Sequence, residues 1–227
     1  MSFWWGLTDF GDSAAMLPAA TLIAGWLVVG QAWRRAVLWC TGFAVLSLLV
    51  ALSKLAFLGW GIGSEALDFT GISGHTALAV SILSVGAAVS LADRSTVLRR
   101  GGVALGATIG LTIGLSRLAL HVHSVSEVVA GAALGGGLAA IYFRGTAYAN
   151  PARLRPAILG GILLLTLGMF HGERAPTQGL LTKMALNLSG RTVPHSRADW
   201  QKDAADQEEA PAQLAQRPRD SSAVVGN

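Results

Sequence analysis

Two short segments of the chain combine residue types that could transfer a phosphoryl group. The first has the sequence GISGHT over residues 71–76, and the second places Arg117, His123 and Glu127 at the spacing R-x5-H-x3-E. A neutral imidazole can attack phosphorus and form a covalent intermediate that water later hydrolyses. A carboxylate on the other ring nitrogen fixes the tautomer and supports the developing positive charge. His123 and Glu127 suit these two roles, because they would share one face of a helix that begins near Ser124.

The other polar groups of these segments could hold the phosphate and protonate the leaving group. The three non-bridging oxygens of the phosphate carry dispersed negative charge, so catalysis depends on hydrogen-bond donors that the protein holds in place. Arg117, Lys54 and the backbone amides of Ser73 and Gly74 are available as such donors. The hydroxyl of Ser73 could add a donor or simply cap the next helix. His75 could protonate the departing alkoxide as general acid.

Each of these residues also has a plainer interpretation. The run SVSE over residues 124–127 fits a capping box, in which Glu127 would only satisfy backbone donors at a helix start. His75 could be a solvated histidine at the membrane interface. His121 and His123 suggest a metal, but two ligands without further histidine or cysteine nearby make a weak metal site.

The spacing of these residues resembles that of a known family. Ser-Gly-His at a helix start, followed by S-R-x5-H-x3-acid, resembles the second and third signature motifs of the PAP2/haloperoxidase superfamily, PSGH and SR-x5-H-x3-D. The first motif of that family, K-x6-RP, lies at the end of the preceding span, where Lys54 matches its lysine. The resemblance covers residues 54–143 and points to the membrane lipid phosphatase branch.

The resemblance implies a role for each matched residue. His123 looks like the nucleophile, Glu127 like the acid that orients it and His75 like the proton donor. The phosphate ligands implied in this way are Lys54, Ser73, Gly74 and Arg117. The spacing from Arg117 excludes His121. The implied activity is a metal-independent phosphatase without a cofactor, which acts on a lipid phosphate or pyrophosphate through a phosphohistidine.

Three positions depart from the family pattern. Ile72 replaces the proline of the second motif, and Glu127 replaces the aspartate of the third with a longer carboxylate side chain. Gly61-Ile62 stands where the first motif has Arg-Pro, so one phosphate-binding arginine is missing. This departure motivates an alternative, a catalytically weak or silent membrane protein that binds lipid phosphates. A phosphotransferase of the same superfamily is a further alternative.

The composition places this chemistry in a membrane. The 227 residues are 52% hydrophobic and 13% charged, whereas a soluble domain has about a quarter charged residues. An all-α, polytopic transmembrane bundle is predicted from six apolar runs at residues 17–33, 36–58, 76–92, 103–120, 125–143 and 157–170. The last run is shorter than the roughly 17 residues that a crossing helix needs. Close helix packing is predicted at Gly102, Gly106, Gly110, Gly114, Gly131 and Gly135.

Loop charges predict the orientation of the bundle. Arginines gather in alternate loops, at Arg34, Arg35, Arg94, Arg99, Arg100, Arg144, Arg153 and Arg155. The positive-inside rule makes these loops cytoplasmic. The candidate site then faces the outside or the periplasm, and the protein is expected in a bacterial inner membrane. The basic residues are too scattered to indicate nucleic-acid binding, and the oligomeric state is left open.

The chain is therefore expected to have two parts. Residues 1–171 form the transmembrane PAP2-like domain, with residues 54–143 as the motif core. Residues 172–227 are rich in polar residues and lack apolar periodicity, so they are expected to form a disordered tail.

Overall fold

The chain folds as a bundle of helices. The computed structural model describes residues 2–146 and 154–200, and these contain eight helices. They are α1 (Ser2–Asp9), α2 (Ser13–Val29), α3 (Trp33–Trp60), α4 (Gly74–Ser90), α5 (Thr96–Ala119), α6 (Val125–Gly145), α7 (Pro156–Met169) and α8 (Thr177–Ser189). The all-α prediction is confirmed.

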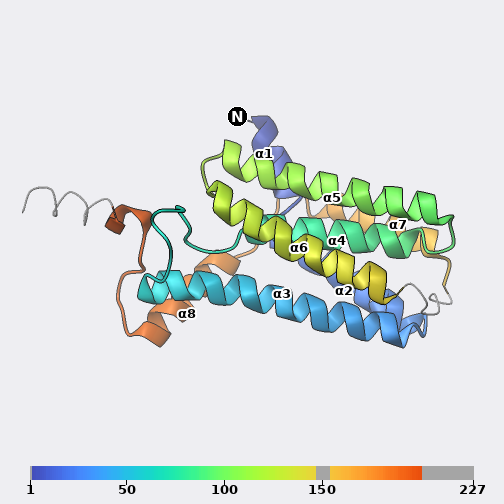
Figure 1. Ribbon diagram of the computed structural model, residues 1–227, viewed down its shortest axis with the longest axis horizontal. Helices are drawn as coiled ribbons and strands as arrows, with labels where there is room; N and C mark the ends of the chain where they lie inside the picture. The colour runs from blue at the N-terminus through green and yellow to red at the C-terminus, as the bar shows by residue number, and fades with distance from the viewer. Residues whose placement is uncertain (1, 147–153, 201–227) are drawn as a thin grey trace, which may run out of the picture.

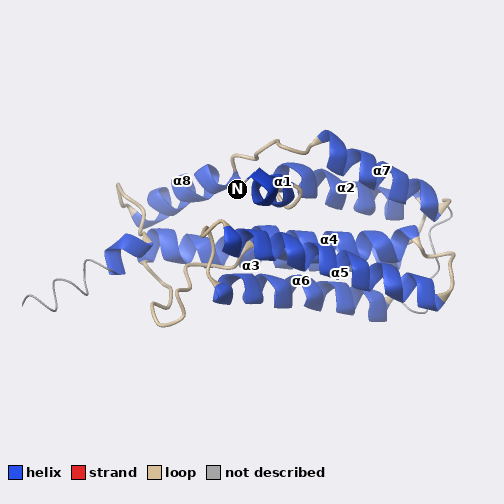
Figure 2. Ribbon diagram, turned by 90° about the horizontal axis from the view of Figure 1, so that it is seen from above, coloured by secondary structure: helices blue, strands red, loops and turns tan. Residues whose placement is uncertain are grey.

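Helix α4 lies at the centre of the bundle. It has α1, α2 and α7 on one side and α5 and α6 on the other (Figure 2). Glycines bring α5 and α6 close to it: a Cβ atom at Gly110 would lie 2.6 Å from the Val80 backbone, and one at Gly131 would lie 2.6 Å from the Ser73 carbonyl oxygen. The predicted close packing is thus confirmed at these positions. It fixes α4 against α5 and α6, and so fixes the place of the first turn of α4, which carries His75.

The outer surface of the bundle is apolar. Helices α3, α5 and α6 expose large hydrophobic side chains such as Leu48, Leu105 and Ile141, as expected where lipid rather than water is the solvent. In the described part of the chain four segments are long and apolar enough to cross a membrane, namely Phe3–Val29, Trp33–Trp60, Thr96–Ala119 and Val125–Gly145. Helices α4 and α7, predicted as spans from their sequence, are apolar but shorter.

The two ends of the bundle differ in chemistry. The loop between α4 and α5 lies at the end opposite the loop between α5 and α6 (Figure 1). Arg94 lies in the first of these loops and His123 in the second. The predicted cytoplasmic arginines and the candidate site therefore occupy opposite ends of the molecule. Arg153 lies outside the described residues.

The structure differs from the sequence-based expectation after residue 172. Instead of an unstructured tail, residues 177–189 form α8, which lies along the end of α3 (Figure 1). The contact is close, since a Cβ atom at Gly59 would lie 3.3 Å from the Ala185 carbonyl oxygen. The sequence did not signal this helix because little of it is buried: Ala185 is its only buried residue, while Leu180, Met184 and Leu188 stay exposed. Residues 201–227, the rest of the expected tail, lie outside the described residues.

Two helix interruptions meet beside α4. One separates α1 from α2 and the other separates α7 from α8. The backbone N–H of Ala175 donates to Oδ1 of Asp12 at 3.0 Å, the hydroxyls of Ser13 and Thr177 are 3.0 Å apart, and the rings of Phe10 and His171 stack at 4.3 Å. Non-helical backbone at membrane depth is tolerated where it is buried in protein or lines a cavity, and both interruptions border one cavity, which Asp12 and Ala175 help to line.

Candidate active site

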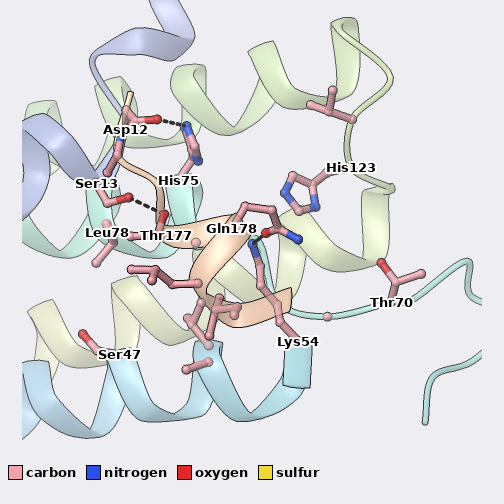
Figure 3. A pocket seen from close by; sticks show the side chains of 18 of the residues that line it. Asp12, Ser13, Ser47, Lys54, Thr70, His75, Leu78, His123, Thr177 and Gln178 are labelled. Atoms are coloured by element: carbon pink, nitrogen blue, oxygen red, sulfur yellow. Dashed lines mark hydrogen bonds and ion pairs between the residues drawn. The ribbon is translucent and has the colours of Figure 1, made fainter. Parts of the chain in front are cut away.

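A cavity of about 630 Å³ opens where these elements meet. Its polar part is lined by Lys54 from α3, His75 from α4, Arg117 from α5 and His123 from the loop before α6. Figure 3 shows Lys54, His75 and His123 around this space. Together with Arg197, which also lines the cavity, five basic side chains thus converge on one volume. This arrangement favours an anionic ligand.

The rest of the cavity wall is largely apolar. Side chains of α2, α3, α4 and α8 supply it, among them Leu17, Val50, Leu78 and Leu181. A cavity with basic groups at one part and aliphatic groups at another matches an amphipathic ligand with an anionic headgroup.

His123 and Glu127 form the predicted pair. Nδ1 of His123 lies 2.5 Å from Oε2 of Glu127. The side chain of Glu127 is fully buried, while that of His123 is 12% exposed and lines the cavity. The pairing leaves Nε2 as the ring nitrogen that is free to meet a ligand.

Glu127 is held by donors from several elements. Oε1 accepts hydrogen bonds from the backbone N–H of Thr70 at 2.7 Å, from the Thr70 hydroxyl at 2.5 Å and from Nη2 of Arg197 at 2.9 Å. Oε2 also accepts from the backbone N–H of Ser124 at 3.2 Å, which completes a capping box at the start of α6. The capping and the histidine-orienting interpretations of Glu127 are therefore both realised, because its two oxygens serve different donors.

The surroundings of His123 favour the neutral ring. Burial lowers the pKa of His123 below its ordinary value of 6.5, and the positive charges of Lys54 and Arg117 lower it further. The hydrogen bond to Glu127 opposes this shift in pKa without cancelling it. A neutral imidazole is the form that can attack an electrophile.

His75 stands on the other side of the cavity. It is in the first turn of α4, and its Nε2 lies 3.6 Å from Oδ2 of Asp12 (Figure 3). Asp12 is the N-cap of α2, where its Oδ1 accepts from the backbone N–H of Ala14 at 2.8 Å. The helix cap therefore fixes the carboxylate that faces the imidazole.

The two cations predicted to bind phosphate are placed by neighbours. Nζ of Lys54 donates to the amide oxygen of Gln178 at 3.1 Å (Figure 3). Nη1 of Arg117 donates to the hydroxyl of Thr8 at 2.9 Å. Both side chains line the cavity.

Ser73 and Gly74, both predicted to bind phosphate, have different surroundings in the structure. Gly74 lines the cavity. Ser73 is fully buried, with its hydroxyl 2.9 Å from that of Thr76 and its backbone N–H donated to the Glu127 carbonyl oxygen at 3.1 Å. The backbone N–H of Ser73 is thus engaged within the protein, because α4 and α6 approach closely at Gly131.

Sequence reasoning missed four residues that shape this site. They are Asp12, Thr70, Gln178 and Arg197. Only Asp12 carried a local signal, since Asp-Ser before an apolar run is typical of a helix start. The other three depend on contacts between distant segments.

His121 is exposed, with a positive φ of 53°. In residues 2–146 and 154–200 no group of three or more histidine, cysteine, aspartate or glutamate side chains is arranged to hold a metal ion.

Comparisons with known proteins agree with the sequence resemblance. A model of the PAP2 superfamily matches residues 62–151, a range that contains His75, His123 and Glu127. A protein of Klebsiella pneumoniae, described as an uncharacterized 22.5 kDa protein in the cps region, is 34% identical over 210 residues. That similarity covers 88% of this chain and 99% of the relative. No solved structure matches the chain.

Proposed function

We propose, because the chain belongs to the PAP2 superfamily, that it is a membrane-bound lipid phosphate phosphatase that acts through a phosphohistidine. The observation that carries the proposal is the contact between His123 and the buried Glu127 at the edge of a cavity lined by Lys54 and Arg117. A nucleophile, its orienting acid and two cations then border the same space.

In the first step Nε2 of His123 attacks phosphorus. The P–N bond forms as the bond from phosphorus to the lipid oxygen breaks, and the departing oxygen takes a proton from His75. Lys54 and Arg117 stabilise the charge on the non-bridging oxygens, and Glu127 stabilises the positive ring of the phosphohistidine. In the second step water attacks phosphorus, the P–N bond breaks, and neutral His75 accepts the proton of the water.

The lipid nature of the substrate is supported by the apolar part of the cavity. Leu17, Val50 and Leu181 line it within a bundle whose outer surface is apolar. A lipid could keep its chains among these side chains while its headgroup reaches the basic groups. The proposed side of action is the outer or periplasmic face, because the arginine-rich loops lie at the other end.

A catalytically silent protein that binds lipid phosphates is the second candidate. The observation that favours it is Gly61-Ile62 in place of Arg-Pro, which leaves Lys54 as the only cation from the first motif. A phosphotransferase would use the same first step and a different acceptor in the second.

The deciding experiment measures phosphate release from a panel of lipid phosphates and pyrophosphates, with detergent-purified protein and a chelator present. We expect release by the wild type and none by His123→Ala. The absence of release from every lipid, by folded protein, would support the silent protein. Transfer of phosphate to an added alcohol in preference to water would support the phosphotransferase.

A further inference from the structure

The C-terminal segment of residues 190–200 crosses the outer end of the site. The backbone N–H of His195 donates to the Leu58 carbonyl oxygen at 2.9 Å, and the rings of Trp200 and Phe57 lie 5.3 Å apart. These contacts fasten the segment to the end of α3. The segment is thereby held next to the loop of residues 61–73, which leads into α4.

Arg197 of this segment reaches into the site. Its Nε donates to Oδ1 of Asp68 at 2.7 Å, and its Nη2 donates to Oε1 of Glu127 at 2.9 Å. The Arg197 side chain is 34% exposed and lines the cavity, whereas the Glu127 side chain is fully buried. The guanidinium therefore joins a surface loop to the carboxylate behind the nucleophile.

The charges explain why this contact matters. A fully buried carboxylate is unfavourable unless a positive group or several hydrogen bonds compensate it. His123 must be neutral to attack, and in that state the pair of His123 and Glu127 carries a net negative charge. Arg197 is then the cation in direct contact with Glu127. When the ring becomes positive in the covalent intermediate, Glu127 lies between two cations.

We propose that Arg197 is a positioning residue, which balances the charge of Glu127 and thereby sets how readily His123 binds a proton. This inference rests on the proposed function, in which His123 is the nucleophile. It also assigns to the C-terminal segment a part in the site: the nucleophile has its full environment only when this segment lies in place.

The test measures proton binding by His123 directly. Protein with isotope-labelled histidine rings is titrated by NMR in detergent, and the His123 signal is identified by its loss in His123→Ala. In Arg197→Gln the positive charge beside Glu127 is removed, so the pKa of His123 should rise by about one unit. In Arg197→Lys, which keeps the charge, the pKa should stay near that of the wild type.

A matched control comes from the same segment. Arg191 is exposed, and its Nε donates only to the nearby Val193 carbonyl oxygen at 3.2 Å. Arg191→Gln removes the same charge from the same segment without touching Glu127, and should leave the His123 pKa unchanged. If Arg197→Gln does not fold, Arg197→Met keeps the length of the side chain without its charge and is judged by the same criterion.

Activity supplies the second measurement. The acid limb of the kcat/KM profile should move to higher pH in Arg197→Gln and return in Arg197→Lys. A merely structural clamp would lower the activity without moving the limb. An unchanged His123 pKa in the charge-removing variants overturns the inference. Since the titration needs no turnover, that result is distinct from a wild type that releases no phosphate, which would overturn the proposed function.

Discussion

Nε2 of His75 lies 3.6 Å from Oδ2 of Asp12, although the two residues belong to different helices. Lys54, Arg117 and His123 also border the cavity around His75. The first two are cations, and His123 becomes one when it is protonated. Asp12 is the carboxylate that faces the imidazole from α2. Burial and the neighbouring cations lower the pKa of His75 well below its ordinary value of 6.5. Asp12 is the opposing negative charge, which supports the protonated ring that the proposed general acid needs.

Substitution of Asp12 should impair proton donation. Asp12→Asn keeps a good helix cap but removes the charge, so we expect kcat to fall about ten- to a hundred-fold, less than the roughly 10²–10⁴-fold effect of losing a general acid. KM should change little, because Asp12 is assigned no contact with phosphate. Steady-state kinetics on a lipid phosphate measures both. Ser13→Ala, which loses only the contact with Thr177, is the control, and an equal loss of kcat in both variants would contradict the role of Asp12.

The two nearby histidines should respond differently to substitution. His123→Ala should lower phosphate release by more than about 10³-fold, because it removes the proposed nucleophile. His121→Ala should retain most of the activity, since His121 is exposed. The assay is phosphate release by purified variants, and similar losses in both would show that the spacing argument is wrong.

The pH dependence should reflect the environment of His123. Burial lowers the pKa of His123 below 6.5, and in the proposed mechanism only the neutral ring attacks phosphorus. The rate should therefore hold as the pH falls towards 6.5 and be lost only below it, as the ring becomes protonated. A kcat/KM profile, with folding checked at each pH, tests this. An acid limb above the ordinary histidine pKa would contradict it.

Two adjacent glycines of α6 should differ in their tolerance of a methyl group. A Cβ atom at Gly135 would lie 2.5 Å from the Ala77 carbonyl oxygen, while one at Gly136 would have no neighbour within 4 Å. Gly135→Ala should therefore destabilise the fold by about 1–3 kcal/mol, and Gly136→Ala should not. Thermal unfolding in detergent compares them, and equal midpoints would contradict the packing of α6 on α4.

The orientation of the bundle can be tested separately from its chemistry. A reporter inserted in the loop of residues 91–95 should be cytoplasmic, because the arginine-rich loops lie at that end. One inserted in the loop of residues 61–70 should report the outer side. The reverse pattern would place the site on the cytoplasmic face.

Local features of the site were readable from the sequence. The helix that begins at Val125 follows from Ser124 and Glu127 at the spacing of a capping box. His123 and Glu127 are four residues apart, so one turn of backbone geometry brings them together. The apolar runs and the spaced glycines likewise predicted the helices around α4 and their close contact. In each case the interacting residues are near neighbours in sequence, or repeat with the period of a helix.

The contacts that complete the site come from the tertiary structure alone. Arg197 meets Glu127 across 70 positions of the chain, and Thr70 meets it across 57. Gln178 comes from a helix that the sequence did not signal, because only Ala185 of α8 is buried and most of its larger apolar side chains stay exposed. No spacing rule relates such residues. Their proximity depends on how the interrupted helices pack together, so the sequence alone determined the local pair of His123 and Glu127, while the packing of distant segments decided which groups surround it.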